Sequence, residues 1–532
     1  MTNDGRSADA PANGGASGDA SGSAAGAASG AASGGANAPA DVPVGGGNAR
    51  RRLVLAGCLM ATFMPAVESS IVATTLPSIV ADLGGFSVFS WVFTIYLLTQ
   101  AVSIPIYGRL ADQYGRKPVI IVGTIMFLSG SVLCGLAWDM PSLICFRALE
   151  GIGAGAIQPI AATILGDIYS PTERGKIQGL VSSVFGVSAV LGPSLGAFLI
   201  QYVSWRVVFW VNVPIGIAAM IILAVFLKES VQHRAHRIDW IGSLLLLLAC
   251  GALMLAMVQA GRLTGTELVV LVVTGVLALI VLFLHERSTP EPMLPLELWR
   301  GNRIVVVGSL GNCFSGAVMM GISAFLPAYV QGAMGETAIA GGLVLGAMSI
   351  SWALASIVGA RLMGRTSYRL TAALGGLCLF FGSVMLVLLQ PSHGPLWASV
   401  GSFVIGIGMG FCSTVYIVSI QASVPWRQRG AATSSSMFLR FIGQAAGAAG
   451  CGAVMNATML RIDPSASGEV DRMLDLGIRA AMDVAQVAHL TDVIARSLQN
   501  AYLLAAVLAL VTVVLAFGLP SWLNPRQQIK PD

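Results

Sequence analysis

The stretch GRLADQYGRK, residues 108–117, is a short charged connection between two long apolar segments. Its two glycines allow a tight turn between helices. Its aspartate can accept hydrogen bonds from nearby helix N-termini or pair with an arginine, and its basic side chains are expected at the surface. A solvated loop explains any one of these charges but not the whole spacing. The residues predicted to form this turn are Gly108, Asp112, Gly115, Arg116 and Lys117.

The composition of the whole chain predicts a membrane protein. Of its 532 residues, 55% are hydrophobic and 10% are charged, and the mean hydropathy is +0.78. A soluble domain carries roughly 25% charged residues. The net charge of +5 does not indicate nucleic-acid binding, because the basic residues are separated by apolar runs and form no continuous patch.

Fourteen segments are long and apolar enough to cross a bilayer, which needs about 20 apolar residues per helix. We predict an all-α integral membrane protein from this count. The predicted spans lie near 53–80, 89–109, 119–137, 141–165, 177–200, 207–227, 240–260, 268–285, 304–331, 340–360, 370–390, 396–420, 431–456 and 500–520.

The distribution of Lys and Arg predicts the orientation, because positively charged connections stay in the cytoplasm. Alternate connections carry most of these residues, and the short connections between them hold only Arg206 and Arg262. An even number of spans then places both termini in the cytoplasm of a plasma (inner) membrane protein. The long connection 457–499 is expected outside. Its segment DRMLDLGIRAAMDVAQVAHL suggests an amphipathic helix on the outer surface.

Three motifs together resemble a known family. The stretch GRLADQYGRK resembles the signature between helices 2 and 3 of the major facilitator superfamily, where it implies a cytoplasmic gating loop. LICFRALEGIGAGA looks like that family's arginine motif, and GVSAVLGPSLGAF looks like its antiporter motif. The chain is most similar to the fourteen-span drug:proton antiporters, in which two helices are inserted between two six-helix halves.

This resemblance implies the domain organisation. Glycines in the predicted fifth span (Gly186, Gly192, Gly196) have an echo in the thirteenth (Gly443, Gly447, Gly450), as duplicated halves of an alternating-access transporter would show. The expected parts are a disordered Ala/Gly/Ser-rich cytoplasmic tail (1–48), an N-terminal six-helix bundle (49–232), two inserted helices (233–290), a C-terminal six-helix bundle (291–525) and a cytoplasmic C-terminus (526–532).

The predicted fourth span carries two opposite charges. Arg147 and Gln158 are spaced to share one helical face, and Glu150 lies at its border. The family resemblance implies a role for Arg147 in proton coupling; a permanent pair between Arg147 and Glu150 is the alternative. The family usually has Gln where this chain has Glu150, which leaves open whether one acid titrates or two.

Glu68 interrupts the first apolar span, in the stretch MPAVESSIVATTLP. A lone carboxylate in hydrocarbon is a candidate functional group. Its helical neighbours Ala61, Pro65, Val72 and Thr75 suit a water-filled cavity. Removal from water disfavours the charged form, so we interpret Glu68 as a proton site that also binds cationic substrates. A neutral, hydrogen-bonded glutamate that fixes helix contacts is the alternative.

Two further helices carry candidate residues. In the predicted fifth span, Gly186, Gly192, Pro193 and Gly196 indicate either a bent, closely packed helix that seals one end of the pathway or plain helix packing. In the predicted thirteenth span, Arg440 can pair with a buried acid, line the cavity, or reach the cytoplasmic surface.

These features predict a proton-coupled exporter of drug-like amphipathic or cationic small molecules. Export of a specific metabolite, siderophore or peptide is the alternative, and a non-transporting receptor or scaffold is a weaker one. No intramembrane catalytic constellation and no ATP-binding motif occurs, so we expect neither an enzyme nor an ATP-driven pump. We expect no metal and no cofactor, since the eight cysteines form no CxxC and the only close histidine pair is His233 and His236. The expected partners are substrate, protons and membrane lipid; a monomer is expected, and a periplasmic adaptor is left open.

Overall fold

The computed structural model describes residues 48–169, 171–229, 239–259, 263–289, 296–425, 429–473, 479 and 482–521. Within these ranges the chain forms helices and turns, with no strand among them, as predicted for an all-α protein. The tail (1–47 of the expected 1–48), the C-terminus 526–532 and the pair His233 and His236 lie outside the described residues. The domain boundaries predicted near 232, 290 and 525 also fall outside them.

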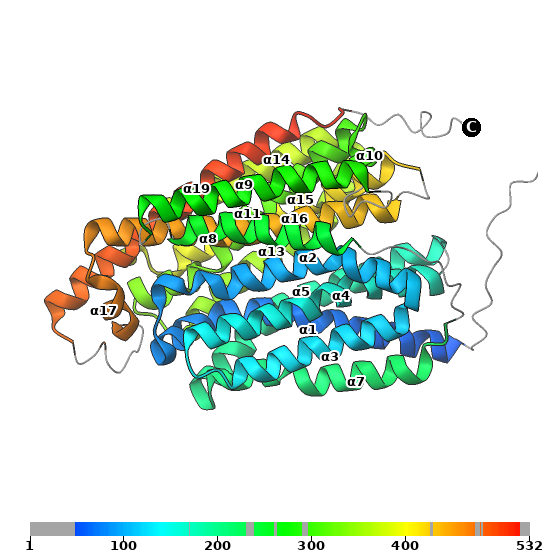
Figure 1. Cartoon of the computed structure of the whole chain (residues 1–532). Helices are drawn as coiled ribbons and strands as arrows, with labels where there is room; N and C mark the ends of the chain where they lie inside the picture. Colours follow the sequence, from blue (N-terminus) through cyan, green and yellow to red (C-terminus); the bar gives the residue numbers. More distant parts are fainter. Residues whose placement is uncertain are drawn as a thin grey trace, which may run out of the picture. The chain divides into compact units, whose positions relative to one another are not determined.

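The first set of helices covers the first six predicted spans (Figure 1). Val211 separates the last two helices of the set, which together cover one span, Trp205–Phe226. The set consists of α1 (Asn48–Leu83), η1 (Phe86–Val88), α2 (Ser90–Tyr114), α3 (Arg116–Gly135), α4 (Met140–Ile168), α5 (Pro171–Tyr202), α6 (Trp205–Trp210) and α7 (Asn212–Phe226).

The second set covers the last six predicted spans. A short π-helical segment, η2, continues the span that α11 begins. The set consists of α10 (Leu296–Trp299), α11 (Arg303–Ser323), α12 (Leu326–Ala328), η2 (Tyr329–Ala333), α13 (Ala338–Arg365), α14 (Tyr368–Val387), η3 (Pro391–His393), α15 (Gly394–Ala422), α16 (Arg429–Ile462), α17 (Ala466–Met473) and α19 (Val484–Ala516).

The predicted spans agree with helices in the structure. Thirteen helical stretches among the described residues are long and apolar enough to cross a membrane. The helix α5, with 32 residues, lies at the remaining predicted position, the fifth. The chain is therefore a multi-pass protein with helices at all fourteen predicted positions.

The connection before the last span is shorter than the predicted 457–499. Helix α16 continues to Ile462, and α19 already begins at Val484. Apolar side chains at Leu490, Val493 and Leu498 are buried on one face of α19, which extends the helix through a stretch of mixed polarity. Among the described residues, the segment expected to be one amphipathic surface helix contains the end of α17 and the start of α19, and residues 474–478, 480 and 481 lie outside the described ones.

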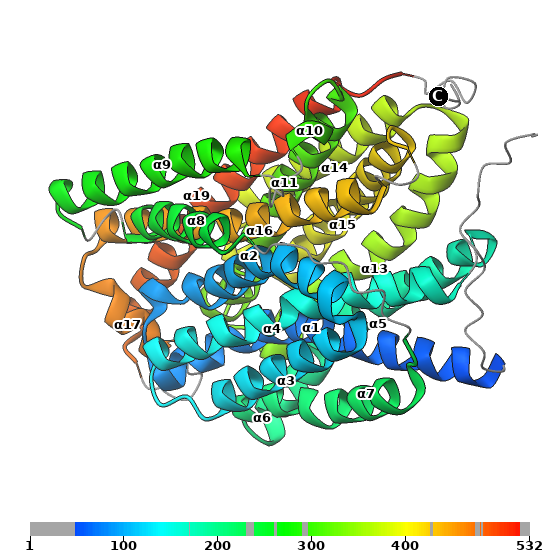
Figure 2. The ribbon, with the colours of Figure 1, turned by 45° about the vertical axis from the view of Figure 1, so that its right-hand side comes forward.

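The two inserted helices are α8 (Trp240–Gln259) and α9 (Gly265–Ser288). They lie side by side in both views, beside the second set (Figures 1 and 2). Helix α8 contacts α16 and α2, whereas α9 packs mainly on α8. Most apolar side chains of α9 are exposed, as expected for a helix that faces lipid.

The helices of each set pack mainly on one another, and two pairs make the most extensive contacts between the sets. Helix α2 packs along α16, and α5 packs along α13. We call these two contacts the seams. They determine which helices can separate if the two sets move relative to each other.

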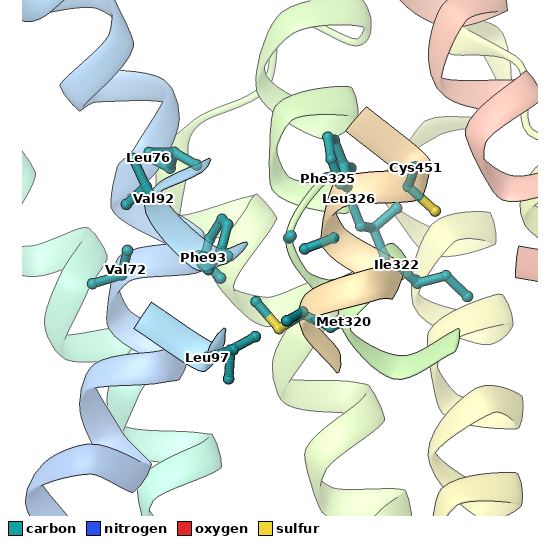
Figure 3. Close-up of a cluster of buried hydrophobic side chains, with 14 of the residues drawn as sticks. Val72, Leu76, Val92, Phe93, Leu97, Met320, Ile322, Phe325, Leu326 and Cys451 are labelled. Carbon is teal, nitrogen blue, oxygen red and sulfur yellow. The ribbon is translucent and has the colours of Figure 1, made fainter. Parts of the chain in front are cut away.

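Apolar side chains of the two sets meet near the end where α17 lies. Figure 3 shows side chains of α1 and α2 facing side chains of α11 and α12, with Cys451 of α16 beside them. The rings of Phe89 and Phe325 meet edge to face with centroids 5.0 Å apart. The Asn456 amide donates to the Ser87 carbonyl, which ties α16 to η1. We call this contact region the closed end.

Candidate functional site

Helix α4 places an arginine in the interior of the first set. A capping box between Asp139 and Ser142 fixes the start of the helix, and Arg147 follows two turns later with 1% of its surface exposed. Its Nη1 forms an ion pair with Glu68 of α1 and lies 2.7 Å from Glu150 Oε2 of its own helix. We call Glu68, Arg147 and Glu150 the buried charge cluster.

Neighbouring helices hold this cluster in place. Asn212 of α7 donates to Glu68 Oε2 at 3.2 Å and lies 3.4 Å from Ser131 Oγ. The Ser131 hydroxyl in turn donates to the Phe209 carbonyl at 2.7 Å. A chain of hydrogen bonds thus orients the carboxylate of Glu68 from the side opposite the arginine.

The guanidinium of Arg147 has further contacts. Its Nε donates to the Val92 carbonyl at 3.2 Å, and its Cζ lies 4.0 Å from the centre of the Tyr96 ring. The Cys134 thiol donates to Glu150 Oε2 at 3.5 Å. Each carboxylate is therefore held by the arginine and by a second polar group.

The charges of the cluster do not balance. Two ionised carboxylates and one guanidinium carry a net charge of −1, and a net charge is costly to bury. Glu150 Oε1 is buried and has no hydrogen-bond partner among the described residues. Uptake of one proton makes the cluster neutral and turns a carboxylate into a donor. The arginine keeps its proton throughout, since a guanidinium does not titrate in proteins.

The surroundings of Glu68 differ from those predicted. We expected its face of α1 to line a water-filled cavity. Instead Glu68 is 1% exposed, and Ala61, Val72 and Thr75 on the same face are buried as well. The reason is the arginine, because an ion pair lets the carboxylate sit inside the packed helices rather than in water. Gln158, also predicted for this site, is half-buried on α4 and forms no hydrogen bond with the described side chains of the cluster.

The neutral members of this site were not predicted from the sequence. Asn212 lies in the apolar run VVFWVNVPIGIAAM, so it carries the same signal as Glu68, a polar group in a membrane span. Ser131, Cys134 and Tyr96 carry no such signal, because these residue types are common inside helix bundles. Only the packing of α2, α3 and α7 brings them to the cluster.

The turn between α2 and α3 consists of one residue. Gly115 has φ of 93°, which lies in the left-handed region that favours glycine. The Glu229 carboxylate, after α7, accepts hydrogen bonds from the backbone N–H groups of Arg116 at 2.8 Å and Lys117 at 3.0 Å. An acid at a helix N-terminus stabilises it by hydrogen bonds and by the helix dipole.

The charged residues of this turn bind to other helices. Arg116 forms an ion pair with Asp167, at the end of α4. The Lys117 ammonium donates to the Ala224 carbonyl of α7. We expected Asp112 to accept hydrogen bonds from a helix N-terminus or from Arg116, but its side chain lies outside the described ones. Glu229 accepts from the first N–H groups of α3. Gly108 lies within α2 rather than in the turn, with open space where a side chain would be.

Glycines of α5 allow close approach to α1. A methyl group at Gly192 would lie 2.9 Å from Ser70 Cβ, and one at Gly196 would lie 2.8 Å from Thr74 Oγ1. The backbone of Gly186 and Pro193 is helical, while their side-chain positions lie outside the described ones. This contact fits the predicted closely packed helix and plain helix packing alike.

Arg440 lies in the second set, away from any acid among the described residues. Its guanidinium is 5.6 Å from the centre of the Trp352 ring on α13. Elsewhere in the described part of the chain, no group of three His, Cys, Asp or Glu side chains is placed to hold a metal ion.

Comparisons with known proteins agree with this architecture. The family model described as Major Facilitator Superfamily matches residues 58–448. The chain is 33% identical over 488 residues to "Multidrug resistance protein 3" of Bacillus subtilis (strain 168), covering 88% of this chain and 95% of the relative. It is 34% identical over 415 residues to "Multidrug transporter protein MdtP" of the same organism, covering 77% of this chain and 76% of the relative.

A solved structure has the same fold. The inward-facing, unoccupied crystal structure of a bacterial homolog of the human lysosomal transporter Spinster superposes with a TM-score of 0.65. The match covers 89% of this chain and 97% of that chain at 18% sequence identity. At this identity the likeness concerns the fold alone, and it confirms the fold class predicted from the sequence.

Proposed function

Because the chain belongs to the Major Facilitator Superfamily, we propose that it is a proton-coupled exporter of drug-like amphipathic or cationic small molecules. The family and the relatives make it a multi-pass membrane transporter and not an enzyme. They also confirm the resemblance to multidrug exporters predicted from the motifs. Proton coupling, the substrate class, the inner membrane and cytoplasmic termini are parts of the proposal.

The observation that carries the proposal is the buried charge cluster. Glu68 and Glu150 share one arginine and are both sealed from solvent. One proton makes the cluster neutral, so binding and release of that proton changes the charge inside the first set. A transporter needs such a group to couple its conformation to a proton gradient.

Exchange follows from competition for the same negative charge. A cationic substrate that reaches the cluster can replace the proton as the balancing charge, and a proton can then displace the substrate. A neutral amphipathic substrate would instead depend on the change of packing that protonation causes. Each ligand shifts the conformational equilibrium only by its difference in affinity for the two states.

The closed end supplies the second requirement, a barrier on one side. We place this end on the outer side of the membrane, since the basic connections, which stay in the cytoplasm, lie at the opposite end. Separation of α2 from α16 and of α5 from α13 at the closed end would open the outer side. Motion of two halves about a fixed site is the general scheme of such transporters.

Export under an imposed pH gradient in proteoliposomes tests the proposal. The protein should move a cationic dye against its concentration gradient when protons flow the other way. Glu68→Gln keeps the size and hydrogen bonding of the side chain but removes its titration, so this variant should lose coupled export while it still reaches the membrane. Glu68→Asp keeps a titrating group with a shorter reach and should retain part of the activity.

Full coupled export by a well-expressed Glu68→Gln protein would contradict the role of Glu68. Transport that ignores the pH gradient in the wild type would contradict proton coupling itself. Export of a metabolite, siderophore or peptide with no export of cationic dyes would favour the alternative substrate class.

A further inference from the structure

Arg440 lies deep within the second set rather than at its surface. It lies about three turns after the start of α16, which corresponds to a distance of about 16 Å along the helix axis at a rise of 1.5 Å per residue. Trp352, whose ring lies 5.6 Å from the guanidinium, is near the middle of α13. The side chain therefore does not extend to the basic end of the helix, which was one of the possibilities in the sequence.

Close packing of α11 lets the arginine reach α13. A methyl group at Gly316 of α11 would lie 2.7 Å from the Arg440 carbonyl oxygen and 3.3 Å from Arg440 Cγ. The stem of the arginine thus runs over a glycine before its head meets Trp352. Helices α16 and α13 are the two seam helices of the second set, so the guanidinium lies between the helices that the first set touches.

Arg440 has no balancing charge in the part of the chain that the structure describes. No hydrogen bond or ion pair links it to a described residue, and its Nε is buried without a partner. The residue as a whole is half-buried. An unpaired guanidinium inside a protein is costly. Arg147, by contrast, forms ion pairs with two carboxylates.

The aromatic partner of Arg440 is itself held in place. The Trp352 indole N–H donates to Ser413 Oγ of α15 at 3.2 Å. Beside the arginine, the Gln444 side chain of α16 is buried. A fixed indole next to a guanidinium provides an apolar surface and a fork of N–H donors in one place.

We propose that Arg440 and Trp352 form a subsite for a carboxylate attached to an aromatic or apolar body. This inference rests on the proposed export function and narrows its substrate class. A guanidinium binds a carboxylate through two parallel hydrogen bonds, and the indole covers the adjoining apolar group. The first set holds a cluster that is negative when both of its carboxylates are ionised, and the second set holds this positive charge. Amphipathic zwitterions, with a cationic and a carboxylate group, therefore suit the pair of sites best.

Two dyes that differ in one group test the subsite. Rhodamine B carries a fixed positive charge and a free carboxylate, and its ethyl ester carries the positive charge alone. Binding to the purified full-length protein is measured by fluorescence anisotropy, and export is measured in proteoliposomes. The wild type should bind the acid more tightly than the ester, and Arg440→Gln should weaken binding of the acid by about tenfold while binding of the ester stays unchanged.

A matched control separates the subsite from the general effect of a lost charge. Arg461→Gln removes an exposed arginine from the last turn of the same helix and should affect neither dye. Arg440→Lys keeps the charge but not the fork, so it should restore the preference for the acid only in part.

Two results would contradict the proposed subsite. The first is a wild-type protein that binds the acid no more tightly than the ester. The second is an Arg440→Gln protein in which binding of both dyes is weakened equally. Either result leaves the proposed function standing as long as the ester is exported under a pH gradient. Failure of the proposed function would appear differently, as export of neither dye by a wild type that still binds the acid through Arg440.

Discussion

Glu68 and Glu150 contact the same atom, Nη1 of Arg147, although they lie on different helices. Glu150 is on α4 with the arginine, whereas Glu68 belongs to α1. Loss of charge on Glu68 weakens the link between α1 and α4, while loss of charge on Glu150 leaves that link intact. The two acids are therefore not equivalent in the contacts that they make between helices.

Glu150→Gln should shift the pH dependence of export toward acid. The variant leaves Glu68 and Arg147 as a pair that is already neutral when both are ionised, so protonation of Glu68 no longer removes a net charge. Half-maximal export should then require a lower pH than in the wild type. Initial rates in proteoliposomes, measured across a series of internal and external pH values, give this midpoint.

A surface acid serves as the control for this variant. Asp492→Asn removes an exposed carboxylate that pairs with Arg496 on α19 and should leave the midpoint where it is. An unchanged midpoint in Glu150→Gln would show that Glu150 takes no part in proton binding.

Asn212→Ala should destabilise the first set. Asn212 is 1% exposed, and its side-chain amide donates a hydrogen bond to Glu68 Oε2. Its removal leaves a buried charged oxygen without that donor, at a cost of about 1–3 kcal/mol. Thermal unfolding of the purified protein in detergent should report a lower midpoint. An unaltered midpoint would mean that the carboxylate finds another donor, and export by this variant should then also be normal.

Glu229→Ala should loosen the start of α3. The carboxylate caps two backbone N–H groups there, at Arg116 and Lys117, and loss of such a cap costs about 1 kcal/mol. Glu229→Gln keeps an acceptor but not the charge and should fall between the wild type and Ala. Hydrogen exchange at the first turn of α3 measures the effect. Equal exchange in all three proteins would contradict the capping role.

Polar residues inside apolar spans were the part of the site that the sequence could predict. Glu68, Arg147 and Glu150 stand out because charge is rare in a membrane helix, and the structure brings all three together. The contact between Glu68 and Arg147 could not be predicted, since the two residues lie 79 positions apart along the chain. Periodicity shows which face of a helix a residue occupies, but not which helix faces it.

The helices followed from hydropathy, with one informative exception. The first turns of α19 contain His489, Asp492 and Arg496. Because these residues lower the mean hydropathy, the last span was predicted to begin only near residue 500. These polar groups lie on faces away from buried Leu490, Val493 and Leu498. The helix extends because one apolar face packs on its neighbours, and an average over all faces does not detect this.

A cross-link across the closed end should stop export. The Asn456 side chain reaches the Ser87 carbonyl, so cysteines at these two positions should lie close enough to be joined by a short thiol-specific cross-linker. The link would hold α16 against η1 and prevent the two sets from separating there, which alternating access requires. Cys145 is an exposed native thiol and should first be replaced by Ser. Export should fall only when both cysteines are present and cross-linked, and cleavage of a cleavable cross-linker should restore export.

The same pair tests the orientation, because a membrane-impermeant reagent added to intact cells reaches it only if the closed end faces outside. Wild-type export by a fully cross-linked protein would show that this end does not open during transport.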